Sequence, residues 1–85
     1  MVVKIEEFEI KLSKIFSGNI TVFLETSNCY IIKTDFVFLV KKDIDSFLRL
    51  LVKYNLKYLG IGVWYSGIYE TSGIYLLIQD VGKSL

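Results

Sequence analysis

A glycine-rich stretch near the C-terminus raises the question of phosphate binding. Residues 60–77, GIGVWYSGIYETSGIYLL, contain four of the chain's six glycines, its tryptophan and three of its six tyrosines. A dinucleotide-binding fingerprint that begins at the first of these glycines needs another glycine where the chain has Tyr65. P-loop spacing also fails, because Ile68 and Tyr69 stand where lysine and serine or threonine are required, and the later Gly-Lys-Ser has Leu77 in place of its first glycine. The glycines are therefore predicted to be architectural.

Side chains suited to catalysis are scarce. The chain has no histidine and one cysteine, Cys29, so the usual zinc ligand sets and a histidine-activated thiolate cannot be assembled. We interpret Cys29 as a small apolar residue of a strand. Glu70 and Asp80 are the carboxylates that a small hydrolase could use for acid and base work, but nothing in the sequence brings them together. We predict no catalytic residue, metal or cofactor, and keep a carboxylate-dependent hydrolase as the alternative.

Two groups of residues are candidates for contact with RNA or a partner protein. One is a set of basic residues in and around a predicted helix, for which a solvated helix face is the alternative. The other is an aromatic pair that could stack on unpaired bases, for which packing is the alternative. The candidates are Lys41, Lys42, Arg49 and Lys53 in the basic set, and Trp64 and Tyr65 in the aromatic pair. With a net charge of +1 and a single arginine, RNA binding is expected to be weak and salt-sensitive.

Helical periodicity is visible in two segments. The first covers residues 5–16, where Glu7 and Lys11 are spaced to pair, and Gly18 is well placed to end the helix. The second follows Asp43, which is a favourable N-cap residue. The apolar stripes are Ile5, Phe8, Leu12, Ile15 and Phe16 in the first helix, and Ile44, Phe47, Leu48 and Leu51 in the second.

Short β-rich runs make up most of the remaining chain. Three of them are predicted over residues 20–24, 29–33 and 36–40, and their short links favour antiparallel pairing. A further hairpin is predicted in GIYETSGIY, with Gly73 as the left-handed residue of the turn and a second strand over residues 74–78. Alternation places Trp64 and Tyr65 on opposite faces of one strand.

These elements predict a single α+β domain over residues 1–85, with a five-stranded antiparallel sheet packed against two to three helices. Hydrophobic residues make up 53% of the chain, but its strongest apolar runs are five residues long, far short of a membrane span. The N-terminus carries three glutamates and does not look like a signal peptide. A cytoplasmic protein with an apolar surface is the expected outcome.

The order of elements and several local motifs resemble a known family. They are EEFEIKLSKIF, CYIIKTDFVFLVKKDIDSFLRLL and LKYLGIGVWYSGIYETSGIYLLIQDV, with the Leu59-Gly60 step as the most specific part. The chain resembles the N-terminal pre-PUA domain of the ribosome-biogenesis factors of the Nip-seven type. That resemblance implies an α+β unit that assists assembly of the large ribosomal subunit without catalysis.

Two departures from the family pattern affect this reading. Ser72, Gly73 and Leu76 stand where the family tends to have basic residues, which weakens an RNA contact there. The sequence also ends at Leu85, where the PUA domain that usually supplies the RNA contacts would begin. Besides ribosomal RNA or a pre-ribosome, the expected partners are therefore a PUA-type domain, another protein or a second copy, and no membrane. Any of these would cover an apolar patch that includes Trp64 or Tyr65 with Val81 and Leu85.

Overall fold

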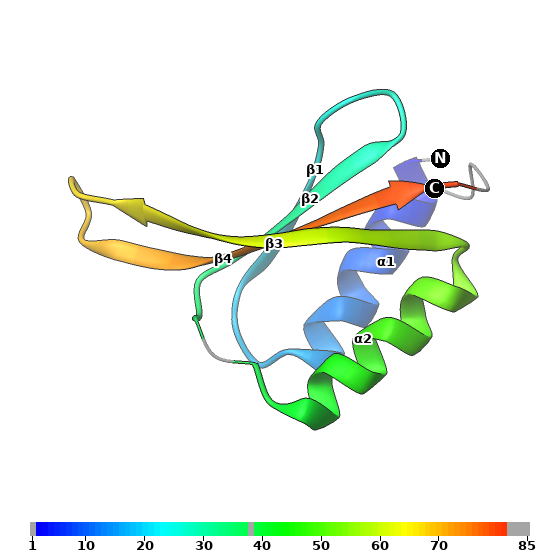
Figure 1. The fold of residues 1–85 in the computed structure, drawn as a ribbon, viewed down its shortest axis with the longest axis horizontal. Coiled ribbons are helices and arrows are strands. Elements are labelled where there is room, and N and C mark those ends of the chain that lie inside the picture. Colours follow the sequence, from blue (N-terminus) through cyan, green and yellow to red (C-terminus); the bar gives the residue numbers. More distant parts are fainter. Residues whose placement is uncertain (1, 38, 82–85) are drawn as a thin grey trace.

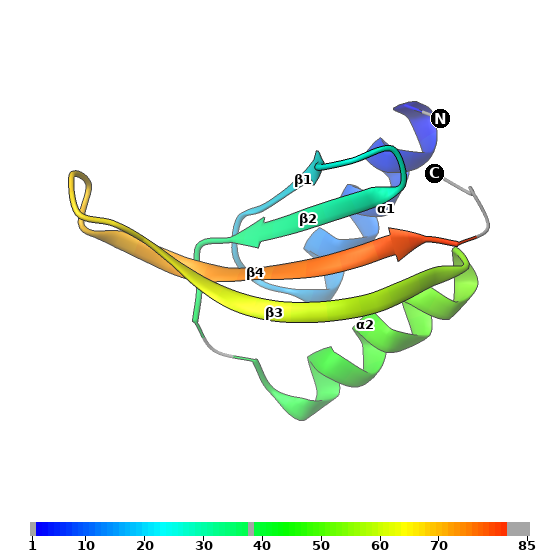
Figure 2. The ribbon, with the colours of Figure 1, turned by 45° about the horizontal axis from the view of Figure 1, so that its top comes forward.

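The computed structural model of the chain describes residues 2–37 and 39–81. The elements in these ranges are α1 (Val2–Ile15), β1 (Ile20–Leu24), β2 (Cys29–Thr34), α2 (Lys41–Lys53), β3 (Leu56–Ser66) and β4 (Thr71–Asp80). Both helices pack against one face of the sheet, and the other face is uncovered (Figure 1 and Figure 2). The predicted α+β class is confirmed. Neither of these helices has the length and hydropathy needed to cross a membrane.

The sheet has four strands in the order β1-β2-β4-β3, and every neighbouring pair is antiparallel. The antiparallel arrangement was predicted and is confirmed, but the described residues form four strands and not the predicted five. β1 and β3 are the two edges of the sheet. The core lies between the helices and the covered face, and its most deeply buried side chains are Phe8, Leu12, Ile32 and Ile78.

The strand predicted over residues 36–40 is wrong. Apart from Phe38, which lies outside the described residues, this run is irregular chain that connects β2 to α2. This run cannot pair with β2, because β1 and β4 already occupy both sides of that strand. Phe36 still contacts the sheet and the core. Its carbonyl accepts a hydrogen bond of 3.1 Å from the Ile74 backbone, and its ring centroid lies 5.7 Å from that of Phe16.

The first helix presents its predicted apolar stripe to the core. The buried members are Phe8, Leu12 and Phe16, and Ile5 and Ile15 are partly buried against them. On the exposed side, Lys11 Nζ lies 3.2 Å from Glu7 Oε1, which confirms the predicted pair. Lys11 lowers the pKa of Glu7, first by hydrogen bonding and then by its charge.

The second helix begins earlier than predicted. Val40 is its N-cap residue and Asp43 lies inside the first turn, so the N-cap assigned to Asp43 is wrong. In that turn the carboxylate still interacts favourably with the helix dipole. Phe47 and Leu51 are buried as predicted, but Leu48 is 44% exposed. The reason is that α2 packs against β3, which is the edge of the sheet.

The hairpin between β3 and β4 is present, but its turn differs from the prediction. Ser66 pairs with Thr71, and residues 67–70 form the connection. The left-handed residue is Glu70, with φ of 51°, and none of the described glycines has a positive φ. Because the turn closes earlier than predicted, Gly73 already lies within β4, where it pairs with Trp64.

Gly62 and Gly73 make room for aromatic rings and for a neighbouring strand. A Cβ atom at Gly62 would overlap the Tyr75 ring. At Gly73 it would overlap the carbonyl oxygen of Thr34 and lie 2.6 Å from Trp64 Nε1. These glycines are architectural, because any larger residue would push the rings or the strand away.

We predict that Gly73→Ala lowers the free energy of unfolding by about 1–3 kcal/mol, because the added methyl group meets backbone that cannot move freely. Gly60→Ala is the matched control, since a Cβ atom there has no neighbour within 4 Å. That variant should leave stability unchanged or raise it by up to about 1 kcal/mol. Urea unfolding of both variants measures the difference, and equal losses would contradict the close approach at Gly73.

Candidate functional site

The residues predicted to contact RNA or a partner lie in two separate places. The basic ones are all on α2: Lys41, Lys42, Arg49 and Lys53. Trp64 and Tyr65 are neighbours on β3 and point to opposite sides of the sheet, as alternation predicted. Trp64 faces the uncovered side, whereas α2 packs on the other, so the structure does not bring Trp64 together with the basic group.

The basic group on α2 is partly engaged by its own surroundings. Lys41 Nζ lies 3.2 Å from Asp45 Oδ2, and Arg49 Nη2 donates to Ser46 Oγ at 3.3 Å. Lys11 lowers the pKa of Lys53, as a hydrogen-bonding neighbour and then as a like charge. These contacts resemble an ordinary exposed helix face, and no aromatic ring of the uncovered sheet face lies beside them.

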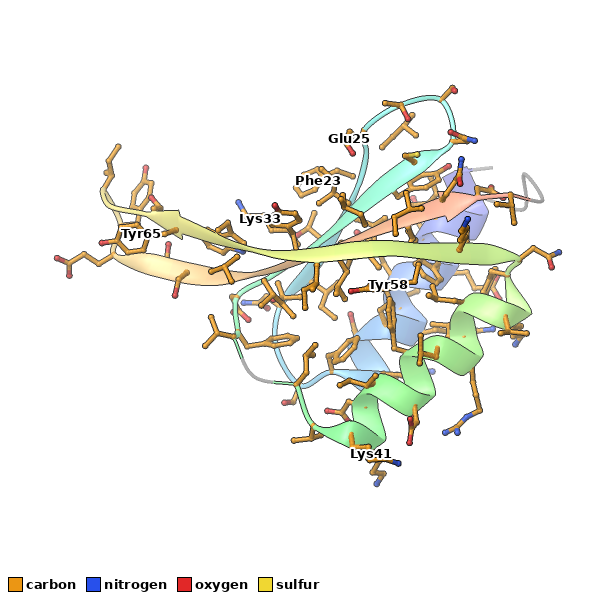
Figure 3. All side chains as sticks on the ribbon, in the orientation of Figure 1. Phe23, Glu25, Lys33, Lys41, Tyr58 and Tyr65 are labelled. Carbon is orange, nitrogen blue, oxygen red and sulfur yellow. The ribbon has the colours of Figure 1, made fainter. Side chains whose placement is uncertain are left out.

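The uncovered face of the sheet carries a cluster of aromatic residues around one lysine. Lys33 Nζ lies 4.2 Å from the centroid of the Trp64 ring. A shallow hollow of about 290 Å³ is lined by Phe23, Ile31, Lys33, Trp64 and Tyr75. Figure 3 shows Phe23 and Lys33 on the side of the sheet away from Tyr58 and Lys41. We call these five lining residues the aromatic face.

Negative charge is nearly absent from the strands. Asp80 is the only carboxylate within β1 to β4, and it is 4% exposed. Asp35 follows β2 and lines a hollow beside Lys33 and Trp64. Its two carboxylate oxygens accept hydrogen bonds from the backbone and side-chain nitrogens of Asn19, at 3.0 and 2.9 Å. Lys33 is therefore the one charged residue among the five of the aromatic face, and Asp35 lies in the adjoining hollow.

Thr34, at the end of β2, fixes the position of Trp64. Its backbone carbonyl accepts a hydrogen bond of 2.8 Å from Trp64 Nε1. Its side-chain hydroxyl donates to the Phe36 carbonyl at 2.9 Å and accepts from the Ile74 backbone at 3.2 Å. One residue thereby joins β2, β4 and the indole ring.

Sequence reasoning selected Trp64 but missed Phe23 and Lys33. The alternation in CYIIKT places Lys33 on the same face as Ile31, and this signal was available. What was missing is the pairing of Phe23 with Ile31 and of Lys33 with Tyr75, because these pairs join segments far apart in the chain. Only the sheet order brings the aromatic face together.

A second surface lies at the opposite face, along the edge strand β3. An apolar groove of about 300 Å³ runs between α2 and β3. Its lining residues are Phe16, Leu39, Ile44, Phe47, Leu48, Tyr58, Ile61 and Leu76. Val63 and Tyr65 continue the strand beyond the groove and are 70% and 71% exposed. Tyr65 belongs to this surface and not to the aromatic face.

The predicted patch that joins Trp64 or Tyr65 to the C-terminal tail is wrong for the described residues. Val81 is 60% exposed, but it follows β4 at the end of the sheet far from the hairpin tip. Tyr65 lies near that tip, where it pairs with Ser72. Leu85 lies outside the described residues.

The carboxylates considered for acid and base work do not meet. Glu70 precedes β4 and Asp80 ends it, so nine strand residues lie between them, a separation of about 30 Å at the usual rise. No group of three metal-ligating side chains occurs within residues 2–37 and 39–81. Cys29 is a half-buried free thiol in β2, with Sγ 3.6 Å from Asn28 Oδ1.

Comparison with protein-family models, curated proteins and solved structures finds no match for this chain. The resemblance to pre-PUA domains therefore gains no support from these comparisons and stays an expectation from the sequence.

We predict that Thr34→Val lowers the free energy of unfolding by about 0.5–1.5 kcal/mol, because the hydroxyl's hydrogen bonds to Phe36 and Ile74 are lost while the Ile74 N–H keeps its bond to the Phe36 carbonyl. Thr34→Ser keeps the hydroxyl and should retain most of the stability. Chemical unfolding followed by circular dichroism compares the two. A serine variant as unstable as the valine variant would show that the hydroxyl is not the stabilising group.

Proposed function

We propose that this chain is a non-catalytic RNA-associated module, and that the aromatic face is where it contacts unpaired bases. The observation that supports this most directly is the composition of that face. Phe23 and Lys33 are exposed there, with the half-buried Trp64 and Tyr75 beside them, on strands whose single carboxylate is buried. Aromatic rings on an uncovered antiparallel sheet are a recurrent way to bind single-stranded RNA.

The indole ring is held ready for stacking. The hydrogen bond from Trp64 Nε1 to Thr34 fixes one edge of the ring, and Gly73 leaves space for it on the sheet. A fixed ring loses little conformational freedom when a base stacks on it, and such stacking contributes about 1–3 kcal/mol per base. Pre-organisation is thus built into the strand pairing.

Lys33 has two roles in this proposal. Without RNA, its ammonium group lies near the Trp64 ring, an attraction of about 0.5–1 kcal/mol at an exposed site. When a base stacks on the ring, the flexible lysine turns to the adjacent phosphate. The lysine thus exchanges its contact with the Trp64 ring for a contact with a phosphate, and it does not block the stacked base.

Affinity should be modest because few cations are available. Lys33 and Lys57 are the lysines within the strands, and Lys57 pairs with Gln79 toward the other end of the sheet. Two phosphate contacts correspond to a slope of about −1.4 in a plot of log K against log salt for a single strand. Binding is therefore expected to be weak and shallow in its salt dependence.

The ribosomal setting comes from the sequence resemblance. Pre-PUA domains of the Nip-seven type imply a role in large-subunit biogenesis, and RNA processing is a closely related setting. The alternative of a small carboxylate-dependent hydrolase is disfavoured by the separation of Glu70 and Asp80 at opposite ends of β4. A PUA-type domain or a partner protein would supply additional affinity.

The chain's only tryptophan allows a direct test. We predict that single-stranded oligoribonucleotides quench the fluorescence of Trp64, whereas duplex RNA of the same composition does so much less. Lys33→Gln should weaken binding about five-fold near 0.1 M salt, as expected for one lost phosphate contact.

Lys42→Gln on α2 is the matched control and should bind like the unchanged protein, because it removes the same charge from the other side of the sheet. If Lys42→Gln weakens binding and Lys33→Gln does not, the RNA surface lies on α2 and the assignment is wrong. RNA turnover that disappears in Glu70→Gln or Asp80→Asn would contradict a non-catalytic role.

A further inference from the structure

The edge strand β3 has little of the shortening, charge or proline that usually protects a sheet edge, although it contains a bulge between Tyr58 and Gly60. It has eleven residues, the longest strand of the four, and one side of it pairs with β4 while the other has no neighbouring strand in the described sheet. Natural edges are often shortened or carry prolines and several charges. β3 has no proline and a single charge, Lys57, next to its first residue. At the opposite edge, β1 has only five residues.

Apolar side chains lie along this open edge. Tyr58, Ile61, Val63 and Tyr65 point to the side of the helices and are 42%, 53%, 70% and 71% exposed. The groove between α2 and β3 begins at Tyr58 and Ile61, with the half-exposed Leu48 on its helix wall. The β3–β4 hairpin then extends beyond the helices (Figure 1), and Figure 3 shows Tyr65 on this extended part.

A strand added to β3 would pair with its open backbone edge and cover its exposed apolar side chains. Its backbone would take up the unpaired groups, and its alternate side chains would enter the groove beside α2, as in other cases of strand addition. The strand that fits best must itself be apolar on alternate residues and nearly uncharged. β3 has this pattern.

Charge and geometry favour a second β3 in antiparallel orientation. Ile61 is the middle residue of the strand, so a two-fold axis near it would place each Lys57 beside the far end of the other strand. The two like charges then stay apart, whereas a parallel pair would put them side by side. Gly60 and Gly62 would face each other on the other side of the sheet and offer no steric obstacle.

The extended hairpin increases the contact. In the antiparallel arrangement, the arm of one copy lies along the beginning of β3 in the other. Because of the bulge between Tyr58 and Gly60, Val63 then comes beside Tyr58 of that copy, and both lie on the helix side. The exposed parts of Leu48, Tyr58, Ile61, Val63 and Tyr65, together with the backbone edge, lie along this contact.

We infer that two copies of this chain associate through antiparallel pairing of their β3 edges, which joins two four-stranded sheets into one continuous sheet. The two α2 helices lie on the same side and enclose the paired apolar residues. Both aromatic faces lie on the other side, so a dimer presents two of them in one surface. The inference rests on the edge and the groove and does not depend on RNA binding.

The test is the mass in solution, measured by light scattering across a range of concentrations. We expect twice the chain mass of 9.8 kDa for the unchanged protein. Ile61→Lys should be monomeric, because it places two cations together at the two-fold axis. Leu24→Lys is the matched control on the β1 edge, where Leu24 is 60% exposed, and it should remain dimeric.

Charge pairing makes the test specific for this axis. Ile61→Lys and Ile61→Glu should each be monomeric alone, and an equimolar mixture should form a heterodimer. Circular dichroism confirms that each variant is folded, which is expected because Ile61 is more than half exposed. Failure of the mixture to associate while both variants are folded would overturn pairing at Ile61.

Two further results would overturn the inference. One is an unchanged protein that stays monomeric up to millimolar concentration, even if an apolar peptide then binds along β3. The other is loss of the dimer in Leu24→Lys with retention in Ile61→Lys. Monomeric Ile61→Lys should still show Trp64 quenching by short RNA, so failure of RNA binding and failure of dimerisation are read separately.

Discussion

The close crossing of β2 over Gly73 is the constraint on which the rest of the structure depends. The Thr34 carbonyl lies where any side chain at position 73 would begin, and its hydroxyl is bonded to Ile74 in the next residue of β4. Trp64 donates to the same carbonyl from β3. Three strands are therefore fixed relative to one another at one point, and the position of the indole ring follows from it.

Periodicity within a segment predicted most of the elements but not their partners. The stripe of α1, the Glu7–Lys11 pair and the first two strands were correct because neighbours in the chain determine them. Residues 36–40 have the composition of a strand, yet β4 pairs with the only side of β2 that β1 leaves open. Residues 36–40 are not a strand because the distant β4 pairs with β2 instead, and the local sequence pattern cannot predict this.

The same limit applies to the candidate site. Alternation was enough to separate Trp64 from Tyr65, since it is a property of one strand. Lys33 on β2 reaches Trp64 on β3 across the strand β4 that lies between them. The contact is possible because the β4 residue opposite Trp64 is Gly73, which has no side chain. The turn was misjudged for a related reason: Gly73 was assigned to a left-handed position, but close packing and not its φ angle requires the glycine.

The apolar residues of the chain form a buried core and two exposed surfaces. A domain of this size can bury only part of its apolar side chains between two helices and one side of a sheet. The remainder divides along β3: Trp64 faces the aromatic side, and Val63 and Tyr65 face the helix side. Because successive residues of a strand point in opposite directions, one strand can contribute to both surfaces without competition. Between Gly60 and Ser66, after the bulge, substitutions should therefore affect one surface or the other according to the parity of their position, and the proposed pairing at the edge would leave the indole ring uncovered.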